Sequence, residues 1–116
     1  MSKNEVKAIK IRGVEYNTDL TELVLSDTAL TNDDIKPLIH MTNLQKLVLP
    51  RKEISELTPL FKLVNLRYLE LLENSKEVAE QIDQLQKQLP ECNIVRMFDF
   101  GGVFVSASAF DYIFRT

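Results

Sequence analysis

The sequence predicts an α/β fold in which a strand and a helical return alternate and stack. Leucine makes up 17 of the 116 residues, and the pattern L-x-x-L-x-L recurs in register from Leu20, Leu44 and Leu66. A fourth, degenerate copy, L-P-E-C-N-I, starts at Leu89. The four starts lie 24, 22 and 23 residues apart, and a fixed period of about 20–50 residues is the signature of stacked repeats.

Each unit is expected to contain one short strand and one helical return. The last two leucines of L-x-x-L-x-L alternate with other residues, as in a strand, and the apolar residues that follow come about every third position, as in a helical or 3-10 segment. One unit cannot bury its apolar side alone. We therefore expect the units to stack, with their strands paired in parallel and their leucines in one continuous core.

Residues 1–18 are expected to form a hairpin-like cap over the first unit. Apolar residues alternate on both sides of Arg12-Gly13, which is placed to make the turn. These residues are Val6, Ile9, Ile11, Val14 and Tyr16.

Capping residues mark the first two returns. Thr31, with Asp34 three residues later, resembles a capping box and predicts a helix over about 32–41. Thr58 followed by Pro59 predicts an N-cap with proline at the first helical position.

The third return is predicted to be the longest helix. Asn74, three residues before Glu77, is expected to begin this helix. Pro90 is expected to end it after about Leu89. One stripe of this helix is apolar, as in a helix that packs on a core. The stripe consists of Val78, Ile82, Leu85 and Leu89.

Four phrases carry a family resemblance: L-T-E-L-V-L-S-D-T-A-L at 20–30, I-K-P-L-I-H-M-T-N-L at 35–44, L-T-P-L-F-K-L-V-N-L at 57–66 and L-P-E-C-N-I at 89–94. They resemble the leucine-rich repeat family, and more narrowly the short internalin-like repeats of bacterial proteins. The resemblance covers 19–95, as three full repeats and one degenerate one. It implies a right-handed solenoid with a short parallel sheet on its concave face, helical or 3-10 returns on its convex side, and a role in binding without catalysis.

Composition argues against several function classes. The net charge of −3 gives no global attraction for nucleic-acid phosphates or an anionic membrane. No apolar run approaches the roughly 18 residues of a membrane span. The first residues of the chain are charged and lack the apolar core of a signal peptide. A single cysteine is consistent with a reducing compartment. We expect a cytoplasmic protein, or a secreted or cell-surface one if the chain is an excised fragment.

We expect no enzyme, no cofactor and no metal site. The one nucleophile–base pair available is Cys92 with His40, which the repeat separates by three strand spacings, about 14 Å, against about 3 Å for a working pair. Cys92 is predicted to be a small core residue and His40 a helix-end residue. No phosphate-binding glycine loop and no zinc spacing is present.

Strand residues that alternate with the buried leucines form the candidate binding face. They give three columns: Glu22, Lys46, Tyr68 and Glu91; Val24, Val48, Glu70 and Asn93; and Ser26, Pro50, Leu72 and Val95. An apolar strip with an aromatic anchor and a charged rim is typical of a protein-binding patch, although scattered apolar residues also occur on ordinary surfaces. The predicted partner-binding residues are Glu22, Val24, Lys46, Val48, Tyr68, Glu70 and Leu72.

Residues 96–116 lie outside the repeats and are rich in aromatic side chains. Gly101-Gly102 is placed to turn a strand near 94–98 back into one near 103–106. Two interpretations stay open: the segment covers the open end of the stack, or it pairs with a second copy or a partner. Simple disorder is the third alternative, and the apolar composition of the segment argues against it. Self-association would use Phe98, Phe100, Phe104, Phe110, Tyr112 and Phe114.

The sequence therefore predicts a noncatalytic protein–protein interaction module that binds an unidentified protein on its concave sheet face. The alternative is a self-associating structural unit, or a fragment of a larger cell-surface protein, that uses the aromatic C-terminal tail.

Overall fold

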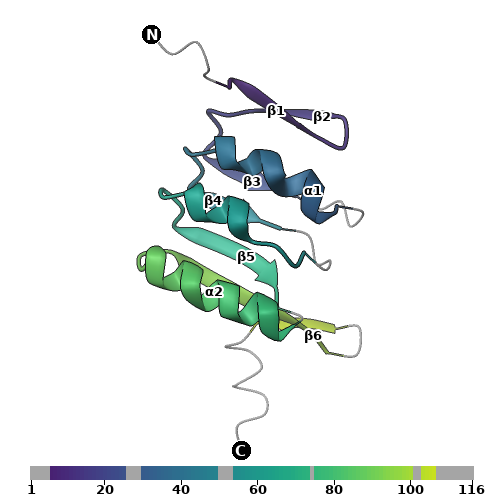
Figure 1. Cartoon of the computed structure of the whole chain (residues 1–116), viewed down its shortest axis with the longest axis vertical. Helices are drawn as coiled ribbons and strands as arrows, with labels where there is room; N and C mark the ends of the chain where they lie inside the picture. Colours follow the sequence, from purple (N-terminus) through teal and green to yellow (C-terminus); the bar gives the residue numbers. More distant parts are fainter. Residues whose placement is uncertain (1–5, 26–29, 50–53, 74, 101–102, 107–116) are drawn as a thin grey trace, which may run out of the picture.

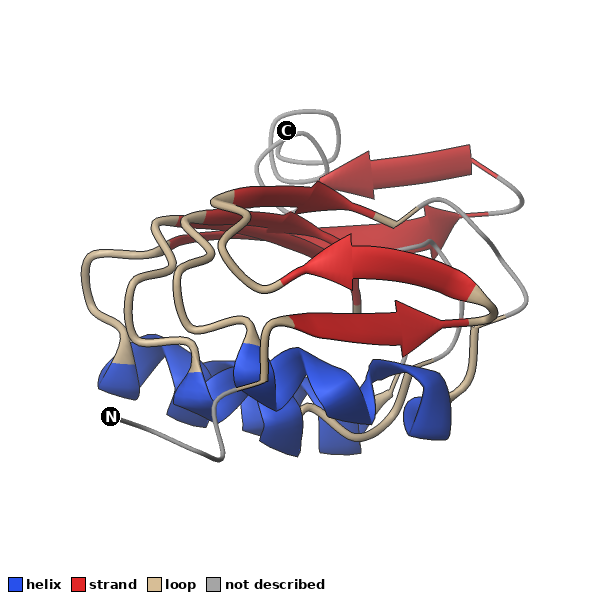
Figure 2. Ribbon diagram, turned by 90° about the horizontal axis from the view of Figure 1, so that it is seen from above, coloured by secondary structure: helices blue, strands red, loops and turns tan. Residues whose placement is uncertain are grey.

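The computed structural model describes residues 6–25, 30–49, 54–73, 75–100 and 103–106. Figures 1 and 2 show two layers, with the helical segments on one side of the larger sheet. In chain order the elements are β1 (Ala8–Ile11), β2 (Val14–Asn17), β3 (Glu22–Val24), α1 (Asn32–Ile35), η1 (Lys36–His40), β4 (Lys46–Val48), η2 (Thr58–Lys62), β5 (Tyr68–Leu72), α2 (Lys76–Gln88), β6 (Asn93–Phe100) and β7 (Val103–Ser106).

The larger sheet has the order β3-β4-β5-β6-β7, and its first four strands are parallel. This is the parallel pairing of successive units that the sequence predicts, in a mixed α/β fold. Leu23, Leu47 and Leu69 lie side by side in the sheet, and Ile94 of β6 continues the row. The alternation of the strands turns these leucines toward the helical layer, where they are at most 5% exposed.

The core lies between the sheet and the returns. Leu38 of η1 and Leu60 of η2 are completely buried there, as are Leu63 and Leu66 at the turn into β5. Shortening one such leucine to alanine typically costs about 2–5 kcal/mol.

The same turn leads the chain into each parallel strand. The N–H groups of Leu20, Leu44, Leu66 and Cys92 each donate to the carbonyl three residues earlier, at 3.2, 3.1, 3.1 and 3.0 Å. The turn before β6 therefore ends at Cys92 rather than at Leu89. Cys92 lies two residues before Ile94, whereas Leu20, Leu44 and Leu66 each lie three residues before the leucine in the same row.

The predicted match of Cys92 with Leu69 is wrong, because Ile94 lies beside Leu69. The third return, α2, has 13 residues, whereas the first has four in α1 and five in η1 and the second has five in η2. The longer return delays the strand.

The first return begins as predicted. The Thr31 hydroxyl accepts from the Asp34 N–H at 3.4 Å, and the Asp34 carboxylate accepts from the Thr31 N–H at 2.8 Å, completing the capping box. The predicted helix is one α-helical turn, α1, that continues as the 3-10 helix η1.

The other two returns begin one residue away from the prediction. Leu57 is the N-cap of η2, so Thr58 is the first helical residue and its side chain caps nothing. Ser75, rather than Asn74, caps α2, and its hydroxyl accepts from the Val78 N–H at 3.1 Å. Asn74 lies outside the described residues. The predicted apolar stripe of α2 is confirmed as buried, and the helix ends as predicted before Pro90.

Side-chain amides join neighbouring returns. Asn32 accepts from the backbone N–H groups of Ser55 and Glu56 at 3.0 and 3.2 Å. Gln81 of α2 accepts from the Leu57 N–H at 2.8 Å and donates to the Ser55 carbonyl at 2.8 Å. These bonds satisfy backbone groups that lie between regular elements and would otherwise need water.

The predicted N-terminal hairpin is confirmed. β1 and β2 pair antiparallel around Arg12 and Gly13, whose φ angles are +53° and +84°. Positive φ at both positions is the geometry of a tight two-residue hairpin turn. Ile9 and Ile11 of β1 join the core at one end of the stack of strands.

At the other end, β6 and β7 form the predicted antiparallel pair, from Met97 opposite Ser106 to Phe100 opposite Val103. Gly101 and Gly102 lie outside the described residues. Within the portion of the chain that the structure covers, no helix has the length and apolar character needed to cross a membrane.

Candidate functional site: the outward face of the parallel sheet

The outward sheet face is formed by strand residues that point away from the helical layer. The strand register places Glu22, Lys46, Tyr68 and Asn93 in one row and Val24, Val48, Glu70 and Val95 in the next. The first three members of each row are those that the sequence predicts. The fourth differs because β6 begins later than expected, so Asn93 replaces Glu91 in the first row and Val95 replaces Asn93 in the second.

Tyr68 lies between a cation and a carboxylate on this face. The Lys46 ammonium lies 5.4 Å from the centre of the Tyr68 ring, which is within range of a cation–π contact. The Tyr68 hydroxyl donates to a Glu70 carboxylate oxygen at 3.0 Å. Partial burial, and then this hydrogen bond and charge, raise the pKa of the Tyr68 phenol above its usual value, so the hydroxyl stays a donor at neutral pH.

Apolar surface lies beside this group. Val24 is 59% exposed, while Val48 and Val95 are half-buried. Glu22 and Lys46 are exposed and carry opposite charges at the ends of neighbouring strands. The arrangement combines an oriented aromatic ring, a strip of valines and charges around it, and these are the components of a protein-binding patch.

Leu72 does not belong to the exposed patch, so the expectation that it is exposed is wrong. It is only 7% exposed and lies opposite Met97, which is 8% exposed. The prediction assumed strands as short as β3 and β4, whereas β5 has five residues and pairs with β6 over its whole length. Ser26 and Pro50, the predicted neighbours of Leu72, lie outside the described residues.

The aromatic residues of the C-terminal segment are only partly covered by the structure. Phe98 is half-buried on β6. Phe100 lies on β6 opposite Val103, and Phe104 lies on β7 opposite Asp99. Phe110, Tyr112 and Phe114 lie outside the described residues.

The structure places Cys92 and His40 on different elements. Cys92 belongs to the core, as predicted, and its burial raises the pKa of its thiol. A raised pKa leaves less of the nucleophilic thiolate at neutral pH. His40 is exposed at the end of η1. Among the described residues, no group of three or more His, Cys, Asp or Glu side chains is placed to hold a metal ion.

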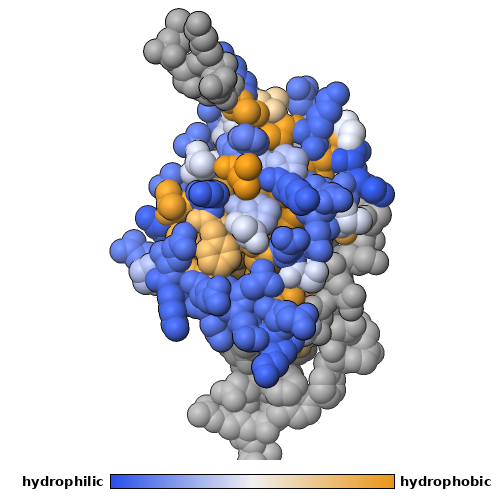
Figure 3. Space-filling view, viewed as in Figure 1, coloured by the Kyte–Doolittle hydropathy of each residue, from blue (hydrophilic) through white to orange (hydrophobic). Residues whose placement is uncertain are grey.

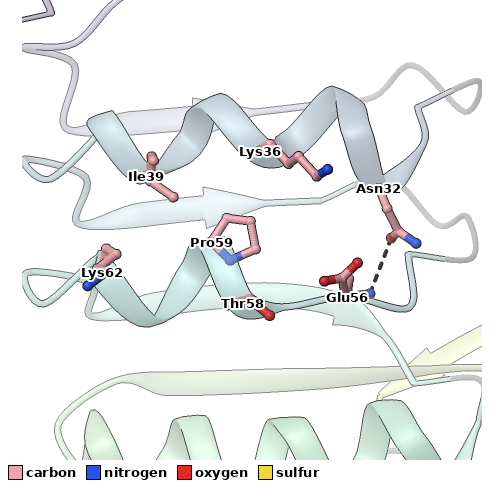
Figure 4. Close-up of a pocket in the computed structure, with 7 residues that line it drawn as sticks. All are labelled: Asn32, Lys36, Ile39, Glu56, Thr58, Pro59 and Lys62. Carbon is pink, nitrogen blue, oxygen red and sulfur yellow. Dashed lines mark hydrogen bonds between the residues drawn. The ribbon is translucent and has the colours of Figure 1, made fainter.

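A small depression on the helical side was not predicted. It has a volume of about 300 Å³ and lies between the first and second returns (Figure 4). Ile39 and Pro59 give it apolar surface, and Lys36 and Lys62 stand at its sides. Lys36 is held by Asp33 at 2.9 Å. Figure 3 shows hydrophobic surface over these short returns and hydrophilic surface over α2.

The sequence does not predict the depression because the residues that line it come from two different returns. In the sequence, the one signal is that Ile39 is apolar but falls outside the spacing of the core residues Leu38 and Met41. In the structure Ile39 is 42% exposed. The outward sheet face and this depression lie on opposite sides of the molecule, so one partner segment does not reach both. Searches of protein-family models, curated proteins and solved structures found no match to this chain.

Proposed function

We propose that this chain is a leucine-rich repeat solenoid that acts as a noncatalytic protein-interaction module. The parallel register of β3 to β6 and the recurring turn before each strand support the proposal, because both return the chain to the same position in each unit. In a right-handed solenoid of this family the sheet lines the concave side and the returns form the convex side. The outward sheet face is then the surface offered to a partner.

The observation that carries the proposal is the fixed position of Tyr68. Lys46 contacts it from the neighbouring strand β4, and Glu70 contacts it from its own strand. An aromatic side chain that is already oriented loses little conformational freedom on binding. Aromatic residues in the centre of a patch also account for much of the binding energy in protein interfaces.

Partner chemistry follows from the residues around the ring. Val24 and Val48 suit an apolar side chain, and Glu22 beside them suits a basic one. The partner segment therefore combines an apolar or aromatic residue with a neighbouring Lys or Arg.

The proposal is tested with a partner recovered on the wild-type chain and then produced as a pure protein. Titration calorimetry compares the wild type with the double variant Tyr68→Ala, Val24→Asp. We expect the double variant to bind at least tenfold more weakly, the loss typical of removing one central aromatic contact.

Val64→Asp is the matched control. Val64 is 58% exposed against 59% for Val24, but it lies in the turn between η2 and β5. The same charge at the same exposure is expected to leave binding unchanged there. Equal binding by the wild type and a folded double variant would remove the outward sheet face from the proposal.

A further inference from the structure

The depression on the helical side lies between two short returns that run in the same direction. η1 and η2 have five residues each, and Figure 4 shows Ile39 of η1 and Pro59 of η2 on the facing sides of the two segments. An engineered apolar cavity of about 150 Å³ holds one benzene molecule. The volume of about 300 Å³ here therefore has room for one or two apolar side chains of a partner.

Acidic and basic side chains lie toward opposite ends of this depression. The first return begins with Asp33 and Asp34 and ends with His40. Glu56 precedes the second return, which ends with Lys62. Because the two returns lie side by side (Figure 4), their first residues share one end of the depression and their last residues share the other.

Lys62 at the basic end differs from Lys36 in having its charge available. Lys36 is bound to Asp33 at 2.9 Å. Lys62 is exposed, and among the residues that the structure describes it forms no ion pair. Its ammonium can therefore receive a carboxylate from another molecule. An exposed ion pair of this kind adds little affinity but selects the sign of the partner's charge.

We propose that this depression is a second docking site, which binds an acidic peptide segment of a protein partner. One apolar side chain of the segment lies between Ile39 and Pro59, and a neighbouring carboxylate binds the Lys62 ammonium. The site is separate from the outward sheet face and does not rest on the function proposed for that face.

The shape of the depression favours a protein segment over a small molecule. Sites for small ligands enclose about 70–90% of the ligand surface, whereas this depression is open to solvent. The exposed residues of α2 are all polar or charged. This helix of a second copy therefore has no exposed apolar side chain to place between Ile39 and Pro59.

Two tetrapeptides that differ only in charge test the proposal: acetyl-Asp-Leu-Leu-Asp-amide and acetyl-Lys-Leu-Leu-Lys-amide. The whole chain, isotopically labelled, is titrated with each peptide, and its backbone amide resonances are followed by NMR. We expect saturable shifts at the amides of Ile39 and Lys62 with the acidic peptide. We expect the acidic peptide to bind about threefold or more tightly than the basic one.

Substitutions at exposed positions separate the charge from the apolar contact. Lys62→Glu is expected to weaken binding of the acidic peptide about threefold or more and to strengthen binding of the basic peptide. Ile39→Asp is expected to abolish the saturable shifts with both peptides. Lys76→Glu is the matched control, because it makes the same charge change at an exposed lysine of α2 that does not line the depression. It is expected to leave binding of both peptides unchanged.

Four results would overturn the proposal. They are the absence of shifts at Ile39 and Lys62 with the acidic peptide, equal binding of the two peptides, an equal loss in Lys62→Glu and Lys76→Glu, and shifts at Ile39 that depend on protein concentration without peptide. The last result shows that a second copy covers the depression. None of these variants changes the outward sheet face, so failure here leaves the function proposed for that face to its own test.

Discussion

The phenol of Tyr68 donates to one neighbour while the ammonium of another lies against its ring. Removing the charge of the acceptor in Glu70→Gln is expected to lower the pKa of Tyr68 toward about 10, the ordinary value. The ultraviolet absorbance of the phenolate, followed against pH in the wild type and in the variant, measures this shift. Tyr68→Phe identifies which of the three tyrosines is responsible.

The raised pKa also fixes the direction of a pH effect. The folded state favours the neutral phenol of Tyr68 more than the unfolded chain does. The resulting stabilisation of the fold is complete below about pH 10 and is lost as the pH rises through the pKa of the folded state. Stability in the wild type should therefore fall more steeply above pH 10 than in Tyr68→Phe. Parallel curves from denaturant unfolding would contradict this.

At the scale of residues, the sequence predicts the buried positions well and the exposed ones less well. The repeat pattern assigns Leu23, Leu47 and Leu69 to the core, and the structure agrees. It does not predict the burial of Leu72, because that depends on how far β5 and β6 pair beyond the leucine motif. The contacts of Tyr68 depend on rotamers and strand spacing, which a residue pattern does not contain.

The start of α2 is capped by a hydroxyl, whereas η2 begins without a side-chain cap. Ser75 accepts from the Val78 N–H, whereas Thr58 makes no capping bond. Ser75→Ala is expected to lower the free energy of unfolding by about 1 kcal/mol, and Thr58→Ala to change it by less than about 0.5 kcal/mol. Urea unfolding measures both. An equal loss in the two variants would show that Ser75 does not cap α2.

The N-terminal hairpin makes a second prediction at the scale of elements. Gly13 has φ +84°, and no atom lies within 4 Å of the position that a Cβ would take. The cost of Gly13→Ala is therefore one of backbone conformation alone, about 1 kcal/mol. Arg12→Asn, which places a residue tolerant of positive φ beside it, is expected to raise the midpoint of thermal unfolding slightly. A midpoint unchanged by Gly13→Ala would contradict this assignment of the turn.

The sequence does not predict the lengths of the helix and strand in the fourth unit correctly. The leucine motif suggests that Leu89 opens this unit, but the structure makes Leu89 the C-cap of α2 and starts the strand at Asn93. The apolar stripe and Pro90 correctly predict where α2 ends. They do not predict how many residues the chain needs to return from a 13-residue helix to the sheet, because that depends on the path through Pro90 and Glu91.

Hydrogen bonds between neighbouring units hold the whole molecule together, and a substitution of Gln81 tests how much they stabilise it. Its amide binds backbone groups of Leu57 and Ser55 in the preceding return. Gln81→Ala is expected to cost about 1 kcal/mol and to speed hydrogen exchange at the Leu57 amide. Gln84 is exposed on the same helix, so Gln84→Ala is the control and should leave both quantities unchanged.

At the scale of the whole molecule, the mixed α/β fold with its parallel sheet was predictable because it follows from a period. A fixed repeat length requires parallel strands, and the structure has four of them with the expected leucine row. The two ends have no such period. The hairpin was predicted from the alternation around Arg12 and Gly13, but the charge of Arg96 inside the last unit has no counterpart in the earlier ones.

The amide bonds between returns have a consequence for how such a chain can change. Asn32 and Gln81 bind backbone atoms of the adjacent return, and every residue has such atoms whatever its side chain. These bonds therefore tolerate substitution of the side chains in the return that they bind. Contacts between side chains, such as the one from Asn32 to the Ser55 hydroxyl at 2.9 Å and the one from Lys46 to the Tyr68 ring, do require particular residues in neighbouring units.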